Sequence, residues 1–176
     1  MTRVEIPVLV PGAAAAEARV ARRPWWLAGL LASALVISGC SIFGGKKATT
    51  VEGNVIAAKD LNPSVSQRPS PLTLRIYELK SDTAFNRADF MSLYQSDQAS
   101  LGADVLVREE FVVQPGETRP YKKTLNPDTR FIAVFGAYRD LERARWRTVV
   151  PVQPGKAQTL TVRADALGVS AQVQQR

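Results

Sequence analysis

Short apolar runs separated by turn residues fill the chain from Val51 onward. The runs recur about every 8 to 15 positions, a spacing typical of a β-sandwich or barrel. Strands are predicted at 51–58, 72–77, 105–107, 111–113, 118–125, 131–138, 147–152, 158–163 and 169–173, with the third and fourth forming either one bent strand or two short ones. Residues 51–176 are therefore predicted to form one mainly β domain, a two-sheet sandwich.

Three of these runs also indicate their place in a sheet. Residues 131–138 are apolar on both faces, so this strand should be central and covered on both sides. Pro120 cannot donate a ladder hydrogen bond, which predicts an edge position for residues 118–125. The alternation that begins at Leu72 slips at Ile76-Tyr77, which predicts a β-bulge there.

The connections have explicit turn chemistry. Val-Gln-Pro-Gly occurs at 113–116 and again at 152–155. Proline fixes φ and glycine accepts a positive φ, so Pro-Gly suits the two central positions of a type II turn. Asn-Pro-Asp-Thr at 126–129 predicts another turn.

One helical segment interrupts the β pattern. Asn86 is predicted as its N-cap, with Asp89 at the third helical position near the positive end of the helix dipole. Helical spacing then places three apolar side chains on one face: Phe90, Leu93 and Tyr94. We expect this face to pack on the outside of the strand at 131–138.

The first 39 residues have the pattern of a secretory signal peptide. Arginines precede an apolar run of 13 residues at 25–37, whereas a membrane-crossing helix needs about 20. The run leads into Ile37-Ser-Gly-Cys40, which matches the lipobox of bacterial lipoproteins. We therefore predict cleavage before Cys40 and acylation of this cysteine. There are two alternatives. The segment is retained as a membrane anchor, or Cys40 is an unmodified thiol that follows an ordinary signal peptide.

The residues after the cleavage site indicate where the protein is held. Residues 40–50 contain two glycines and two lysines without periodicity, so we predict the lipidated cysteine followed by a flexible tether. Ser41 stands where an aspartate would favour retention at the inner membrane. The protein is therefore predicted on the periplasmic face of the outer membrane, where two or three acyl chains anchor firmly.

Composition removes several function classes. The 176 residues include no histidine, which excludes an imidazole-based triad, a His-ligated zinc site and a His-ligated haem. A single cysteine cannot close an intramolecular disulfide. Removing residues 1–39 takes four arginines and two glutamates with them, so the net charge falls from +7 to +5, too little to indicate nucleic-acid binding.

The sequence offers no recognisable chemistry for catalysis. It contains no nucleophile elbow, no phosphate-binding glycine loop and no calcium loop. We predict no enzyme, no cofactor and no metal site. An enzyme assembled from carboxylates far apart in the sequence is the remaining catalytic alternative.

Two polar segments stand out between the strands. Lys59–Pro71 is a 13-residue connector with three prolines, and loops of this length in a small domain are often functional. A solvated insertion is the alternative. The second segment is Arg139–Arg147, in which Trp146 is predicted to anchor the core and the charged residues to form ion pairs; a basic contact patch is the alternative.

These segments carry a resemblance to a known family. The order and spacing of Leu61-Asn-Pro, Arg68-Pro-Ser-Pro-Leu, Arg75-Ile-Tyr-Glu-Leu, Ala137-Tyr-Arg-Asp and Ala144-Arg-Trp-Arg resemble those of the type VI secretion lipoprotein family (TssJ, SciN or VasD). The resemblance covers about residues 51–165, and Cys40 lies where the family has its lipidated cysteine. It implies a transthyretin-like β-sandwich with a short helical insertion.

The resemblance also implies a function. Members are structural proteins of the outer membrane that bind the periplasmic C-terminal region of the inner-membrane protein TssM, which connects them to TssL. The loop associated with TssM binding corresponds here to Lys59–Pro71. Its candidate contact residues, chosen for expected exposure, are Asp60, Asn62, Ser64, Gln67 and Arg68. The alternative is a stand-alone lipoprotein whose sandwich binds a small ligand in an apolar pocket.

The lipobox predicts that the mature protein begins with an acylated cysteine. Mass spectrometry of the mature protein from membranes should find Cys40 as the first residue, carrying acyl chains. Cys40→Ser should yield a folded domain that no longer partitions with membranes, because no thiol remains to be acylated. An unacylated native N-terminus would contradict the anchor.

Overall fold

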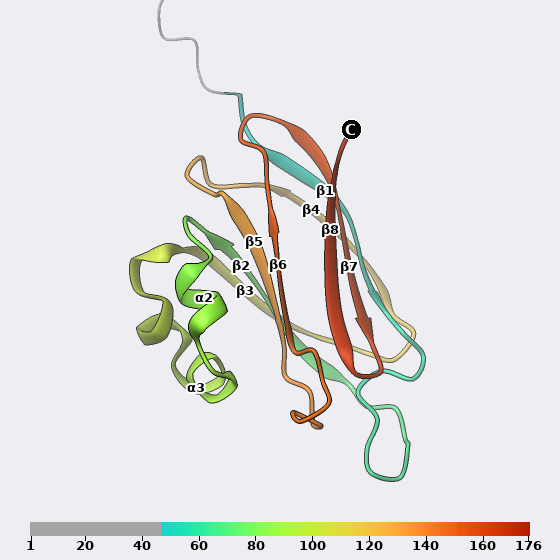
Figure 1. The fold of residues 1–176 in the computed structure, drawn as a ribbon. Coiled ribbons are helices and arrows are strands. Elements are labelled where there is room, and N and C mark those ends of the chain that lie inside the picture. The colour runs from blue at the N-terminus through green and yellow to red at the C-terminus, as the bar shows by residue number, and fades with distance from the viewer. Residues whose placement is uncertain (1–46) are drawn as a thin grey trace, which may run out of the picture. The chain divides into compact units, whose positions relative to one another are not determined.

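Two four-stranded sheets pack face to face in a computed structural model, which describes residues 47–176 (Figure 1). The predicted signal peptide, Cys40 and most of the predicted tether lie outside the described residues. The mainly β, two-sheet fold with a short helical insertion confirms the predicted fold class. Among the described residues, no helix is long and apolar enough to cross a membrane.

The first sheet has the strand order β4-β1-β7-β8. Its strands are β4 (Thr118–Thr124), β1 (Thr50–Ala57), β7 (Ala157–Asp165) and β8 (Gly168–Gln175). The strand β1 pairs parallel with β7 and antiparallel with β4, and β7 pairs antiparallel with β8. The edge position of β4 confirms the prediction from Pro120, which pairs opposite Asn54.

The second sheet has the order β3-β2-β5-β6, with antiparallel pairing throughout. Its strands are β3 (Val105–Val113), β2 (Leu72–Leu79), β5 (Phe131–Gly136) and β6 (Arg147–Pro151). Of the two alternatives for residues 105–113, the structure has one continuous strand. The interior position of β5 confirms the prediction made from its two apolar faces.

The predicted bulge in β2 is misplaced. The register shifts between Glu78 and Leu79, not at Ile76-Tyr77. Ile76 faces the core between the sheets, while Tyr77 faces the helices on the other side. Two adjacent apolar residues here reflect a strand buried on both faces, which a period-two pattern cannot distinguish from a bulge.

The helical insertion covers the outer face of the second sheet (Figure 1). It comprises α2 (Thr83–Arg87), α3 (Phe90–Leu101) and the 3₁₀ turn η2 (Gly102–Asp104). The predicted N-cap is wrong: Asn86 lies inside α2, and its side chain donates to Asp82 at 2.9 Å. Asp89 caps α3 instead, accepting a hydrogen bond from the backbone N–H of Ser92 at 2.9 Å.

The face predicted for this segment packs where expected. The Phe90 ring lies 5.1 Å from that of Phe135 on β5, centroid to centroid, and Leu93 is fully buried. Tyr94 remains about half exposed. Trp146 contacts Phe90 and Phe135 edge-on and packs against both cores, which confirms its predicted role as an anchor.

The predicted turns are present. Gly116 and Gly155 have φ of 78° and 72°, as the Pro-Gly turns require. In the turn at 126–129, the N–H of Thr129 donates to the carbonyl of Asn126 at 3.0 Å. The connections between the strands lie at the two ends of the sandwich.

One end of the sandwich, the tether end, is where β1 begins, together with the β4–β5 turn, the β6–β7 turn and the end of β8 (Figure 1). The opposite end, the loop end, has the β1–β2 loop, the β5–β6 loop and the β7–β8 turn (Figure 1). The chain therefore enters the sandwich at the end opposite its longest loops.

A charged network fastens the helices to the second sheet. The buried Arg75 of β2 donates to the carbonyls of Leu93 and Tyr94 at 2.7 and 3.1 Å and to Glu110 at 2.5 Å. Asp97 accepts from Tyr77 at 2.8 Å and from Arg108 at 2.6 Å. Burial acts to raise the pKa of Asp97, but these two partners lower it below its usual value.

Arg75→Met should destabilise the fold by about 3 kcal/mol, because it leaves the α3 carbonyls without their donor and removes one of the two cations that Asp97 and Glu110 share. Arg163→Met is the matched control, since Arg163 is exposed and lies 4.0 Å from its partner Asp165. This control should change stability by less than about 0.5 kcal/mol. Chemical denaturation measures both, and equal losses would contradict the role given to Arg75.

Candidate functional site

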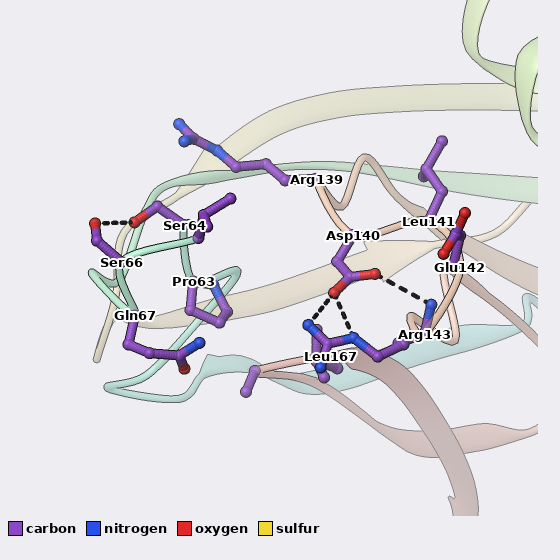
Figure 2. A pocket seen from close by; sticks show the side chains of 12 residues that line it. Pro63, Ser64, Ser66, Gln67, Arg139, Asp140, Leu141, Glu142, Arg143 and Leu167 are labelled. Carbon is purple, nitrogen blue, oxygen red and sulfur yellow. Dashed lines mark hydrogen bonds and ion pairs between the residues drawn. The ribbon is translucent and has the colours of Figure 1, made fainter.

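The two polar segments singled out in the sequence meet at the loop end. They form the walls of an open groove of about 950 Å³, and the β7–β8 turn closes one side of it (Figure 2). The lining comprises Pro63, Ser64, Val65, Ser66, Gln67, Arg139, Asp140, Leu141, Glu142, Arg143, Ala166 and Leu167. The groove is thus built from segments about 75 and 100 residues apart in the chain.

Asn62 ties the two long loops together. Its side-chain Nδ2 donates to the carbonyl of Pro71 at 2.9 Å, and its Oδ1 accepts from the backbone N–H of Arg139 at 3.0 Å. The residue is only 3% exposed and has a φ of 44°, a conformation that asparagine tolerates better than most residues. Its predicted exposure is therefore wrong: the amide is used inside the protein, positioning the loops.

The tip of the β1–β2 loop is closed on itself. The N–H of Ser64 donates to the carbonyl of Arg68 at 2.9 Å, and the N–H of Gln67 donates back to Ser64 at 2.9 Å. At the base, the N–H of Ser70 donates to the carbonyl of Leu61 at 2.9 Å. These bonds hold Val65 at the apex, where its side chain is fully exposed. An apolar side chain displayed this way is available for contact.

The opposite wall is a single turn of the β5–β6 loop. The guanidinium of Arg143 donates to Asp140 at 2.6 Å, and the N–H of Ala144 donates to the Asp140 carbonyl at 2.9 Å (Figure 2). The hydrogen bond from Arg143 lowers the pKa of Asp140 below its usual value, so this pair is ionised at neutral pH. Leu141 projects from the same turn and is more than one-third exposed.

The structure separates the predicted contact residues into three groups. Ser64 and Gln67 line the groove. Asp60 and Arg68 are exposed but do not line it. Asn62 is buried beneath it.

Apolar and charged side chains that were not among the predicted contact residues face the loop across the groove, among them Leu141, Arg143 and Leu167. The segment 139–147 was noted for its charge, but nothing in the sequence indicated that it lies beside residues 63–67. The proximity arises from sheet order, because β2 and β5 are neighbours and present their loops at the same end.

The groove has the chemistry of a contact surface. Val65, Leu141 and Leu167 offer apolar contact, while Arg139, Glu142 and the serines offer polar contact around it. Mixed apolar and polar composition with arginine is typical of protein–protein interfaces. Within residues 47–176, no group of three or more acidic or cysteine side chains is placed to hold a metal ion.

Asn62→Ala should destabilise the protein by about 1–3 kcal/mol, because the Pro71 carbonyl and the Arg139 N–H lose buried partners. Ser66→Ala removes only an exposed side-chain hydrogen bond to Ser64, and it should be nearly neutral. Hydrogen exchange should show the Arg139 amide losing protection in the first variant alone. Unchanged protection there would contradict the role of Asn62.

The chain is similar in sequence and fold to known proteins. The family model described as type VI secretion lipoprotein (VasD, EvfM, TssJ) matches residues 49–167. No curated protein matched the sequence. The crystal structure of the lipoprotein TssJ1 from Pseudomonas aeruginosa is 40% identical, with a TM-score of 0.70, and the match covers 73% of this chain and 98% of that one.

Two further solved structures share the fold at lower identity. One, titled "Type VI membrane complex", is 22% identical with a TM-score of 0.61, over 70% of this chain and 97% of that one. The other, titled for the TssM C-terminal domain from EAEC, is 20% identical with a TM-score of 0.56, over 72% and 98%. The family match spans most of the sandwich and agrees with the 40% identical structure, so this chain belongs to the type VI secretion lipoprotein family.

Proposed function

We propose that this protein is a structural lipoprotein of the type VI secretion membrane complex. Acylated Cys40 anchors it in the outer membrane after removal of residues 1–39, and the loop end docks the periplasmic C-terminal region of TssM. TssL belongs to the same complex through TssM. Membership of a lipoprotein family that is structural rather than enzymatic supports this role.

The observation that carries the proposal is the opposition of the two ends. The chain enters at Thr50, ten residues after Cys40, and the groove lies beyond the far end of the eight-residue β1. At about 3.3 Å per residue, β1 alone separates the ends by roughly 26 Å. An anchor at the tether end allows the groove to face away from the outer membrane, where a partner from the inner membrane can reach it.

The groove gives this docking a physical basis. Val65 and Leu141 stand on opposite walls and are exposed, so a partner that buries both recovers hydrophobic energy of about 25 cal/mol per Å². The loop backbone is already fixed by its own hydrogen bonds and by Asn62, so binding orders little additional chain.

Weak individual contacts suffice in such an assembly. Several copies of the lipoprotein acting on one assembled partner bind at a high effective concentration, since each contact holds the others in place. The protein therefore works by position and not by turnover. Structures that share the fold at lower identity are described as a type VI membrane complex and as the TssM C-terminal domain, which is consistent with this role.

Val65→Asp should weaken binding to the periplasmic C-terminal region of TssM at least tenfold, because a carboxylate would be desolvated at the centre of the contact. Val112→Asp is the matched control, since Val112 is half exposed on β3 and does not line the groove. Calorimetry with the purified sandwich and the TssM region measures both affinities, and thermal melting confirms that both variants fold.

Deletion of Ser64–Arg68 extends this test to membranes. The wild-type protein should co-purify with TssM, and the deletion variant should not. If Val65→Asp and Val112→Asp bind equally well, or if the deletion variant still retrieves TssM, the loop is not the docking element.

A further inference from the structure

The tether end of the first sheet carries a rim of exposed cations. The rim consists of Lys47, Lys122, Lys156 and Arg176, all exposed. Backbone hydrogen bonds bring them around the start of β1: Thr50 donates to the carbonyl of Lys156 at 3.1 Å, and Arg176 donates to the carbonyl of Ala157 at 3.3 Å. Lys47 lies against Gly155 in the β6–β7 turn. We call these four residues the basic rim.

A single acidic side chain, Glu52, lies within the rim. It accepts a hydrogen bond from Arg176 at 3.0 Å and lies 3.5 Å from the Lys122 ammonium group. Arg176 and then Lys122 lower the pKa of Glu52, so the carboxylate is ionised at neutral pH. A shallow depression of about 400 Å³ is lined by Glu52, Lys122 and Arg176 together with Thr50 and Gln158. The rim has four cationic side chains and one acidic side chain, so its side chains carry an excess of positive charge.

The adjoining parts of the tether end are balanced. In the β4–β5 turn, exposed Arg130 is matched by exposed Asp128. At the end of β2, the backbone N–H of Lys80 donates to the carbonyl of Asp104, and Asp82 follows two residues later. The excess charge is therefore confined to the first sheet, where the chain enters.

The proposed anchor places this rim next to lipid. Lys47 follows Cys40 by seven positions, and seven residue steps reach at most about 24 Å whatever their conformation. Lys46 adds one more cation to that stretch in the sequence. Surface cations interact with a charged membrane over about 8 Å at physiological salt, and the short connection lets the rim come within that range.

We propose that the basic rim binds the phosphate groups of anionic phospholipids and so orients the sandwich with its loop end pointing away from the membrane. This inference rests on the proposed lipid anchor, which sets which end faces the bilayer. Without such a contact, the tether would allow the sandwich to tumble and to present the groove in every direction. With it, the groove is held toward the periplasm before any partner arrives.

The test uses residues 41–176, which lack Cys40. This segment folds without the leader, since the buried residues of the described part lie between Thr49 and Val169 and residues 45–176 form a compact unit of their own. Sedimentation with vesicles of phosphatidylcholine containing phosphatidylglycerol, and with vesicles of phosphatidylcholine alone, measures binding at low and at physiological salt. We expect binding to the anionic vesicles only, weakened by salt.

Charge-matched variants separate the rim from net charge. Replacing Lys47, Lys122, Lys156 and Arg176 by glutamine should reduce the affinity for anionic vesicles at least twentyfold. Replacing four exposed cations of the loop end, Lys59, Arg68, Arg139 and Arg145, by glutamine changes the net charge equally and should leave the affinity nearly unchanged. Glu52→Gln should raise the affinity about fivefold, which corresponds to one surface charge near an anionic membrane.

Failure of this proposal is distinguishable from failure of the proposed function. No binding to anionic vesicles, or equal losses in the two fourfold variants, would overturn the rim while leaving acylation and TssM binding untouched. Conversely, an unacylated Cys40 in cells would not alter these vesicle affinities, because the tested segment lacks Cys40. Circular dichroism melting of each variant confirms that a lost affinity comes from lost charge.

Discussion

The buried amide of Asn62 is the contact on which the groove depends. One side chain bonds both the end of its own loop, at Pro71, and the start of the β5–β6 loop, at Arg139. Two long connections that would otherwise move independently are thereby held as a pair. Because the Asn62 side chain is buried, leaving its amide without these partners would be costly, and the loops keep their spacing. The groove is in this sense a property of the sandwich rather than of a mobile loop.

A second constraint acts on the face of the second sheet that the helical insertion covers. Both faces of β2 and β5 are covered, one by the first sheet and one by the helical insertion. Arg75 stands within the helical layer and bonds carbonyls of α3, while its acidic partners are shared with Arg108. The strands that support the groove are therefore clamped from both sides, which makes the loop end a rigid platform.

Much of the fold could be predicted from the sequence, because the strands are marked by local patterns. The two-faced apolar run of β5, the proline in β4 and the repeated Pro-Gly turns each have one local physical reading, and each prediction was confirmed. The errors arose where two readings share one pattern. Adjacent Ile76 and Tyr77 fit a bulge as well as a doubly buried strand, and either Asn86 or Asp89 could cap a helix. Only packing decides between them.

The groove itself was less predictable. Its two main segments were recognised as polar connectors, but their meeting depends on sheet order, which local patterns do not specify. Polarity was also a poor guide to exposure, since Asn62 is polar yet buried by the hydrogen bonds it makes. Nothing in the sequence indicated that Leu167 lines the groove. This leucine reaches the groove only because the fold places the β7–β8 turn beside the β5–β6 loop.

The parallel pairing of β1 with β7 has a mechanical consequence. Tension between the two membranes would enter the domain at Thr50 and leave it beyond Ala57, at opposite ends of the same strand. That strand is bonded along its length to β7 on one side and β4 on the other, by slanted bonds in the parallel pair with β7 and perpendicular bonds in the antiparallel pair with β4. Load applied at the two ends of β1 runs along its covalent backbone, and the ladders on both sides keep the strand from being peeled out of the sheet. In the proposed assembly, the domain would therefore resist stretching along the axis from the tether end to the loop end.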